Sequence, residues 1–289
     1  MATDFTEETA AGAVIESFGP STSPRLREVL TSLVSHLHAF ARDVELTLPE
    51  WGAAIDFLTR TGQMCDADRQ EFILLSDVLG LSMLTETINN RKFGVATEST
   101  VLGPFHVVES PPKELGASID MVGTGTPCVV SGQVTGTDGN PVPGATLDVW
   151  QANDQGFYDV QQPDVQPRTN GRGLLVADAE GRFWFRTIVP SHYPIPTDGP
   201  VGELLRATGR HAFRPAHIHF IVAAPGFREL TTHIFVAGSQ YIDSDTVFAV
   251  KQSLVVDFTP VDDPAEGERW HVPVPFRRAD IEIILQPAR

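Results

Sequence analysis

The chain has 289 residues, 42% of them hydrophobic, and a formal net charge of −16 with a sequence pI near 4.8. Its length allows one large domain, or one domain with a smaller companion, and its hydrophobic content excludes global disorder. The acidic balance argues against nucleic acid or an anionic membrane as the partner, because both require a basic face.

Compartment is indicated by the N-terminus and the cysteines. Residues 1–19 contain acidic side chains and neither a basic start nor a long apolar run, so we expect no secretory signal there. No stretch of the sequence reaches the apolar length that a membrane span needs. Cys65 and Cys128 lie far apart and fit a reducing compartment better than a disulfide framework. We therefore expect a cytoplasmic protein.

The first hundred residues have helical periodicity. Between 24 and 44, apolar residues recur at steps of three and four and form one stripe: Leu26, Val29, Leu30, Leu33, Val34, Leu37 and Phe40. Residues 47–50 (Thr-Leu-Pro-Glu) are a capping-box pattern with proline in the first turn, and predict a second helix to about Gly62. A third helix is expected over 67–89, with Gly80 as a candidate interruption.

From about residue 126 the pattern changes to alternation, with Gly- and Pro-rich turns between short segments. The expected strands are 129–135, 145–151, 174–178, 183–188, 216–223, 230–236 and 281–285. The sequence contains no alternating βαβ units and no Gly-rich phosphate loop. The predicted fold class is therefore α+β, with a helical part at 1–108, a linker near 109–112 and a mainly antiparallel β-sandwich or barrel at 109–289.

The strongest chemical signal is the segment 214–222. As a strand it places His217 and His219 on the same side, since successive side chains point to opposite faces. Two buried imidazoles are costly unless their nitrogens are satisfied, and a metal ion would satisfy them. A single strand histidine is more often hydrogen-bonded in a core, so a metal site requires further ligands.

Carboxylate and tyrosine are the candidates for those ligands. A two-histidine, one-carboxylate triad would bind Fe(II), but the next acid is Glu229, ten residues past His219, which breaks the spacing of a cupin-type site. Tyr158 and Tyr193, two of only three tyrosines, lie in loops that leave expected strands. A phenolate is a hard anionic donor that suits Fe(III). Packing over a loop is the alternative for either tyrosine alone.

Residues 150–158, 182–196 and 214–220 together resemble the intradiol ring-cleavage dioxygenases, which open catechols between the two hydroxyl-bearing carbons with O2 and non-haem Fe(III). The resemblance implies that the iron ligands are Tyr158, Tyr193, His217 and His219. It also implies a helical dimerisation region at 1–108, a catalytic β-sandwich at 109–289, and a homodimer that often encloses a phospholipid. From the residues alone, the apolar stripe is equally explained by an intramolecular core.

The resemblance assigns two catalytic roles beside the iron. Tyr193 would leave the metal as a phenol that carries one substrate proton. Arg214 would stabilise carbanionic character on the activated ring, a task that suits its permanent planar charge. On sequence grounds alone, Arg214 could equally be paired with an acid.

Substrate choice is expected at positions that match the family's substrate wall: Leu74, Asp77, Val101, Leu102, Gly103, Pro104, Phe105, Ile195, Pro196 and Val247. Asp77, the one acid, is either on the helix surface or accepts a hydrogen bond from a third substrate hydroxyl, which would disfavour plain catechol. The strings 97–105, 231–235 and 241–245 resemble the hydroxyquinol subgroup. Within them His233 replaces a glutamine that is common in catechol enzymes, and it is expected beside the site or simply hydrogen-bonded in its strand.

We therefore expect the chain to cleave hydroxyquinol (benzene-1,2,4-triol) to 3-hydroxy-cis,cis-muconate, the tautomer of maleylacetate, in aromatic compound degradation. Catechol or chlorocatechol 1,2-dioxygenase activity is the alternative within the family. A different class is a non-catalytic transthyretin-like β-sandwich that binds ligands, which the turn-rich segment 132–145 resembles. Such a module would need neither iron nor coordinating tyrosines.

Overall fold

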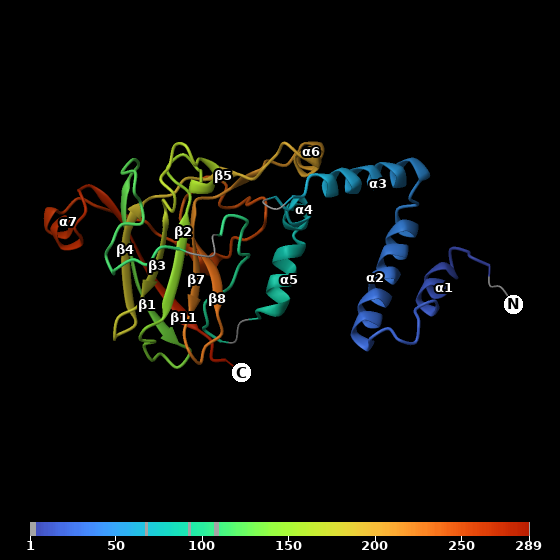
Figure 1. The fold of residues 1–289 in the computed structure, drawn as a ribbon, viewed down its shortest axis with the longest axis horizontal. Coiled ribbons are helices and arrows are strands. Elements are labelled where there is room, and N and C mark those ends of the chain that lie inside the picture. Colours follow the sequence, from blue (N-terminus) through green and yellow to red (C-terminus); the bar gives the residue numbers. More distant parts are fainter. Residues whose placement is uncertain (1–3, 67–68, 92–93, 107–109, 289) are drawn as a thin grey trace. The chain divides into compact units, whose positions relative to one another are not determined.

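The computed structural model describes residues 4–66, 69–91, 94–106 and 110–288 (Figure 1). The chain forms two compact units, Met1–Gln63 and Met64–Arg289, which are described separately below. The boundary expected between residues 108 and 109 falls on residues outside the described ranges. Within those ranges, no helix has the length and apolar character required to cross a membrane.

The first unit consists of helices α1 (Ala10–Glu16), α2 (Pro24–Asp43) and α3 (Leu48–Gln63). The helices predicted over 24–44 and 47–62 are confirmed as α2 and α3, whereas α1 was not predicted. The capping box is present: the Thr47 backbone N–H donates to Glu50 Oε2 at 2.9 Å, and the Glu50 N–H donates to Thr47 Oγ1 at 3.4 Å. These two bonds satisfy N–H groups that the first helical turn would otherwise leave unpaired.

The apolar stripe of α2 lies on the surface. None of the residues of α2 is buried, and Leu33 and Leu37 are 57% and 56% exposed. Within the first unit, the stripe therefore does not form a buried core.

The second unit begins with two short helices, α4 (Glu71–Val78) and α5 (Leu81–Asn89). Between them Gly80 adopts φ +74°, a left-handed conformation that glycine accommodates without steric cost. The predicted interruption at Gly80 is confirmed, and residues 67 and 68 of the expected helix lie outside the described ranges. Helices α6 (Pro200–Ala207) and α7 (Pro264–Trp270) were not predicted.

Two main sheets form the body of the second unit (Figure 1). The four-stranded sheet has the order β10 (Thr259–Val261), β11 (Phe276–Leu285), β1 (Pro127–Gly136) and β4 (Arg182–Ile188). The five-stranded sheet has the order β3 (Arg172–Val176), β2 (Thr146–Gln151), β7 (His217–Ala223), β8 (Leu230–Val236) and β9 (Val255–Val256). The pairing is mostly antiparallel, with β1–β11 and β8–β9 parallel. The predicted α+β class with a β-sandwich is confirmed.

The core lies between the two sheets and determines where polar side chains must go. Ile218, Phe220 and Val222 of β7 belong to one buried apolar cluster with Val130 and Phe185 of the other sheet. Because side chains alternate along a strand, the remaining buried residues of β7 face away from this core. The outer face of the five-stranded sheet is therefore available for a polar site beneath the loops.

Candidate metal centre and active site

A row of four side chains crosses the outer face of the five-stranded sheet. The strand register places Arg172 opposite Trp150, Trp150 opposite His219, and His219 opposite His233. The Trp150 and His219 rings stack with centroids 4.5 Å apart and an interplanar angle of 13°. All four side chains are buried. His219 is thus held between an indole and a second imidazole.

Four of the predicted site residues meet at one buried point. The Nε2 atoms of His217 and His219 are 3.1 Å apart, and the Tyr158 hydroxyl lies 2.9 Å from His219 Nε2. The hydroxyls of Tyr158 and Tyr193 are 3.5 Å apart. None of the four residues is more than 2% exposed. The structure therefore brings together the residues that the sequence identified from three separate segments.

The protonation of the two histidines follows from their outer contacts. His217 Nδ1 lies 2.7 Å from the Pro215 carbonyl oxygen, which only accepts, so Nδ1 carries the proton and Nε2 is unprotonated. His219 Nδ1 lies 2.7 Å from His233 Nε2, and His233 Nδ1 lies 2.7 Å from Thr100 Oγ1. Burial lowers the pKa of all three imidazoles well below the usual range, which keeps them neutral.

The arrangement in which each Nδ1 carries the proton leaves both facing Nε2 atoms unprotonated. Two lone pairs 3.1 Å apart repel each other, and a cation bound between them would remove this repulsion. His217, His219 and His233 are grouped closely enough to hold a metal ion. Both nitrogens of His233, however, are engaged by His219 and Thr100, so its contacts orient His219.

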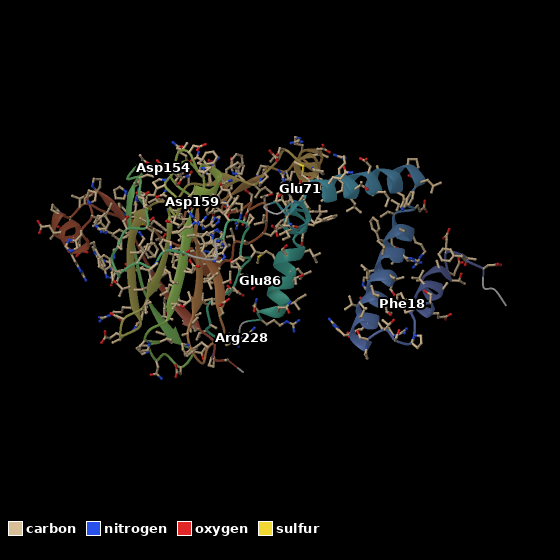
Figure 2. The ribbon with its side chains drawn as sticks, in the orientation of Figure 1. Phe18, Glu71, Glu86, Asp154, Asp159 and Arg228 are labelled. Carbon is tan, nitrogen blue, oxygen red and sulfur yellow. The ribbon has the colours of Figure 1, made fainter. Side chains whose placement is uncertain are left out.

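The loop that carries Tyr158 is anchored by a buried ion pair. Asp159, labelled in Figure 2, begins the short helix η1 (Asp159–Gln161). Its Oδ1 accepts hydrogen bonds from Arg172 Nε and Nη2 at 2.8 and 2.6 Å, and its Oδ2 accepts one from the Thr169 N–H at 2.8 Å. These bonds fix the backbone next to Tyr158. Burial raises the pKa of Tyr158 well above its usual range, as does Tyr193, whereas the charges of Arg214 and Arg172 act to lower it.

Tyr193 and Arg214 are neighbours in a two-stranded sheet that was not predicted. Tyr193 opens β5 (Tyr193–Pro194) and pairs with Arg214, which ends β6 (Phe213–Arg214). Arg214 Nη1 lies 3.3 Å from the Tyr193 hydroxyl and 3.3 Å from His217 Nε2. The guanidinium also pairs with Asp245 at 3.2 Å. The two alternatives for Arg214, a contact in the site and a partner of an acid, are both realised.

Two of the predicted wall residues contact the cluster directly. Gly103 has φ +81°, and a Cβ added there would lie 3.0 Å from His219 Cε1, so the backbone of this loop packs against the imidazole. The Phe105 ring stacks on Tyr158 with centroids 4.7 Å apart, and meets the edge of Tyr193 at 6.3 Å. These contacts place residues 103–105 against the cluster.

Asp77 is mostly buried and lies on α4, within electrostatic range of Arg214 and Asp245. Burial raises the pKa of Asp77, a hydrogen bond with Ser82 and the charge of Arg214 lower it, and Asp245 raises it again. The helix that carries Asp77 is held by Glu71 (Figure 2), whose Oε1 accepts from the Val201 N–H of α6 at 3.1 Å and whose Oε2 pairs with Arg69 at 2.8 Å. Asp77 is therefore only partly exposed, unlike a fully solvated residue on a helix surface.

The other predicted wall residues differ in burial. Leu74, Ile195 and Val247 are buried, Val101 and Pro196 are half-buried, and Leu102 and Pro104 are exposed. Their roles as substrate contacts stay predictions.

Five residues that support the site were not singled out from the sequence: Thr100, Trp150, Asp159, Arg172 and Asp245. Thr100, Trp150 and Asp245 stood within strings that carried the family resemblance, but nothing local indicated their partners. Asp159 directly follows a candidate ligand, which is the one signal that pointed to it. Arg172 is 13 residues from Asp159 and Asp245 is 31 residues from Arg214, so both pairs depend on the fold.

Comparisons with known proteins identify the class. The family model described as Dioxygenase matches residues 102–287, and the one described as Catechol dioxygenase N terminus matches residues 23–97. The chain belongs to the intradiol ring-cleavage dioxygenase family and is an enzyme of that class. The alternative of a non-catalytic sandwich module is therefore not supported.

Similar proteins carry more specific names. Hydroxyquinol 1,2-dioxygenase of a Rhizobium species is 53% identical over 91% of this chain and 90% of its own. A 6-chlorohydroxyquinol 1,2-dioxygenase of Cupriavidus pinatubonensis is 53% identical, covering 88% of this chain and 92% of its own. The crystal structure of hydroxyquinol 1,2-dioxygenase from Pseudomonas putida superposes with a TM-score of 0.92 at 47% identity, covering 98% of this chain and 99% of that one.

Proposed function

We propose that the protein cleaves hydroxyquinol with O2 between two adjacent hydroxyl-bearing carbons, giving 3-hydroxy-cis,cis-muconate, the tautomer of maleylacetate. Family membership supports the reaction type, and relatives named for hydroxyquinol support the substrate. The observation that carries the proposal is the convergence of Tyr158, Tyr193, His217 and His219 at one buried point.

We propose that these four residues hold Fe(III). The fit rests on the donor set: two neutral imidazoles present lone pairs, and a phenol whose pKa burial raises would ionise only beside a cation. Two phenolates and one hydroxide balance the charge of a trivalent ion, which favours Fe(III) over Fe(II). Bound there, Fe(III) would supply Lewis-acid activation of the diol for attack on O2.

The protein's own residues would then move one proton and stabilise one charge. Once ionised to a phenolate, Tyr193 can accept a proton from a substrate hydroxyl. It would then keep that proton as a phenol beside Arg214. The guanidinium of Arg214 would stabilise negative charge that develops on the ring. Phe105 and Trp150 pack on the ligand rings and exclude water from this chemistry.

Asp77 is the residue that would select the triol. Its carboxylate lies within electrostatic range of Arg214, and as an acceptor it would pair with a third hydroxyl on the ring. Catechol leaves that partly buried acceptor without a partner, which costs binding free energy. Catechol or chlorocatechol cleavage is the competing specificity.

The assembly and compartment are also proposals. An exposed apolar stripe along the 20-residue helix α2 supports a homodimer formed through the N-terminal helices. The same stripe would accommodate a phospholipid at the dimer interface. Cys65 and Cys128 are both thiols, which supports a cytoplasmic location.

The test combines colour with oxygen uptake. Protein reconstituted with iron should be red to burgundy from tyrosinate-to-Fe(III) charge transfer, and anaerobic hydroxyquinol should shift this band. Oxygen uptake should be faster with hydroxyquinol than with catechol or 4-chlorocatechol. A colourless protein after reconstitution contradicts the metal site, and a clear preference for catechol contradicts the substrate.

A further inference from the structure

Arg214 is held from one side by an acid that the proposed chemistry does not use. Its Nε lies 3.2 Å from Asp245 Oδ1, and its Nη2 lies 3.4 Å from Oδ2. Both side chains are 2% exposed. The carboxylate therefore engages two nitrogens of the guanidinium and leaves Nη1 for the Tyr193 hydroxyl and His217 Nε2, each at 3.3 Å.

Asp245 is itself fixed by the backbone of its turn. Its Oδ1 accepts from the Val247 N–H at 3.3 Å, and its Oδ2 accepts from the Ala249 N–H at 3.1 Å. The Thr246 N–H donates to the carbonyl of Phe213 at 3.2 Å, which ties the turn to the strand that carries Arg214. The carboxylate has little freedom to follow the guanidinium. Asp245 therefore determines the position of Arg214.

The ion pair is also required by burial. An arginine charge inside a protein is costly unless an acid compensates it, and the free energy of the pair depends on good geometry. Burial has the largest influence on the pKa of Arg214 and acts to lower it. The charge of Asp245 opposes burial and helps to raise this pKa above its usual range. Asp77 also interacts with Arg214 electrostatically, whereas the hydrogen bonds of the guanidinium to a carboxylate are with Asp245.

We infer that Asp245 is the positioning residue for Arg214: it directs Nη1 at the Tyr193 hydroxyl and, through Val247 and Ala249, shapes the turn that carries part of the expected substrate wall. The catalytic part of this inference rests on the proposed function. The same pairing leaves Asp77 available to a substrate hydroxyl. Loss of Asp245 is therefore expected to affect both kcat and the KM for hydroxyquinol.

The experiment compares Asp245→Asn with the control Asp243→Asn, which changes an exposed acid in the same turn. Asp245→Asn should lower kcat by about 100-fold, the scale of losing one preorganised charge contact. Its iron content and charge-transfer band should stay near wild type, and Asp243→Asn should keep kcat within about twofold. A kcat for Asp245→Asn within about threefold of wild type overturns the inference.

A double-mutant cycle separates positioning from a general structural role. In an Arg214→Gln background, Asp245→Asn should lower kcat by less than about threefold, because an acid that acts through Arg214 has nothing left to position. If Asp245→Asn retains its full effect in that background, Asp245 acts independently of Arg214 and the inference is wrong. Asp245→Glu keeps the charge but displaces it, so it should lose kcat while it stays folded.

A measurement on the iron-free protein keeps the inference testable apart from catalysis. Asp245→Asn leaves a buried charge without its partner and should lower Tm by about 5–10 °C. The double variant Arg214→Gln/Asp245→Asn should recover at least half of that loss, whereas a double variant as unstable as the sum of both single variants contradicts the pairing. If wild type cleaves no diol, the proposed function fails, while this cycle still decides whether the pair forms.

Discussion

His219 Nδ1 lies 2.7 Å from His233 Nε2, and this contact determines which nitrogen of His219 faces the tyrosines. The chain of contacts ends at the Thr100 hydroxyl, 2.7 Å from His233 Nδ1. His233 is therefore the part of the sheet that fixes the orientation and the tautomer of a candidate ligand.

The first prediction is that His233→Ala weakens iron binding by about 10–100-fold, the range expected when a residue that orients a metal ligand is lost. His233→Gln should retain more affinity, because an amide still offers one acceptor and two donors. Iron affinity is measured by competition with a chelator. His36→Ala, at an exposed position of α2, is the control, and equal affinity in His233→Ala and the control would contradict this role.

The second prediction concerns the anchor of Tyr158. Arg172→Met leaves Asp159 buried without its partner and should reduce the free energy of unfolding by about 3–5 kcal/mol. The charge-transfer band should weaken or shift, because the loop next to Tyr158 loses its attachment to β3. Denaturant unfolding and visible spectra measure the two effects. Arg182→Gln removes an exposed arginine that pairs with Asp178 and should change neither quantity appreciably.

Substrate preference provides the third prediction. Asp77→Asn should lower kcat/KM for hydroxyquinol by about tenfold relative to catechol, since a charged acceptor for the third hydroxyl is replaced by a weaker one. Steady-state oxygen uptake with both diols gives the ratio. Asp198→Asn, at an exposed position before α6, should leave the ratio unchanged. An unchanged ratio in Asp77→Asn would remove Asp77 from the substrate contacts.

The fourth prediction follows from the raised pKa of Asp77, of which burial is the main cause. A carboxyl whose pKa is higher in the folded state than in the unfolded state binds its proton more tightly when folded. Stability from this group is thus fully present below the unfolded pKa and is lost as pH rises through the folded pKa. Asp77→Asn should raise Tm at pH 7, and the gain should vanish as pH falls below about 4. A gain that is constant with pH would show that charge is not its cause.

The sequence predicted elements whose determinants are local. Helix α3 begins at a capping box that residues 47–50 display directly, and β7 and β8 follow from alternation. The two-residue strands β5 and β6 were not predicted, because they exist only through pairing between Tyr193 and Arg214, which are 21 positions apart. Helices α6 and α7, of eight and seven residues, are too short to show a periodic pattern.

In the candidate site, too, the sequence predicted only what local patterns or family resemblance determine. His217 and His219 are two residues apart in one strand, so their common orientation follows from strand geometry alone. The tyrosines required family resemblance, because loop conformation is not contained in a local pattern. The partners Asp159 and Asp245 required the fold itself. The α2 stripe shows what the sequence leaves ambiguous. An apolar helix face has the same sequence pattern whether it contacts its own chain or another molecule.

The row from Arg172 to His233 makes the register of the sheet a condition for chemistry. A strand that slips by one residue exchanges its two faces. A slip of β7 would place His217 and His219 between the sheets and turn Ile218 and Phe220 toward the tyrosines. Only correctly registered chains can then bind the metal. The intensity of the charge-transfer band of the iron-loaded protein would therefore measure the fraction of molecules whose strands have paired correctly. Misfolded chains with intact secondary structure would stay colourless.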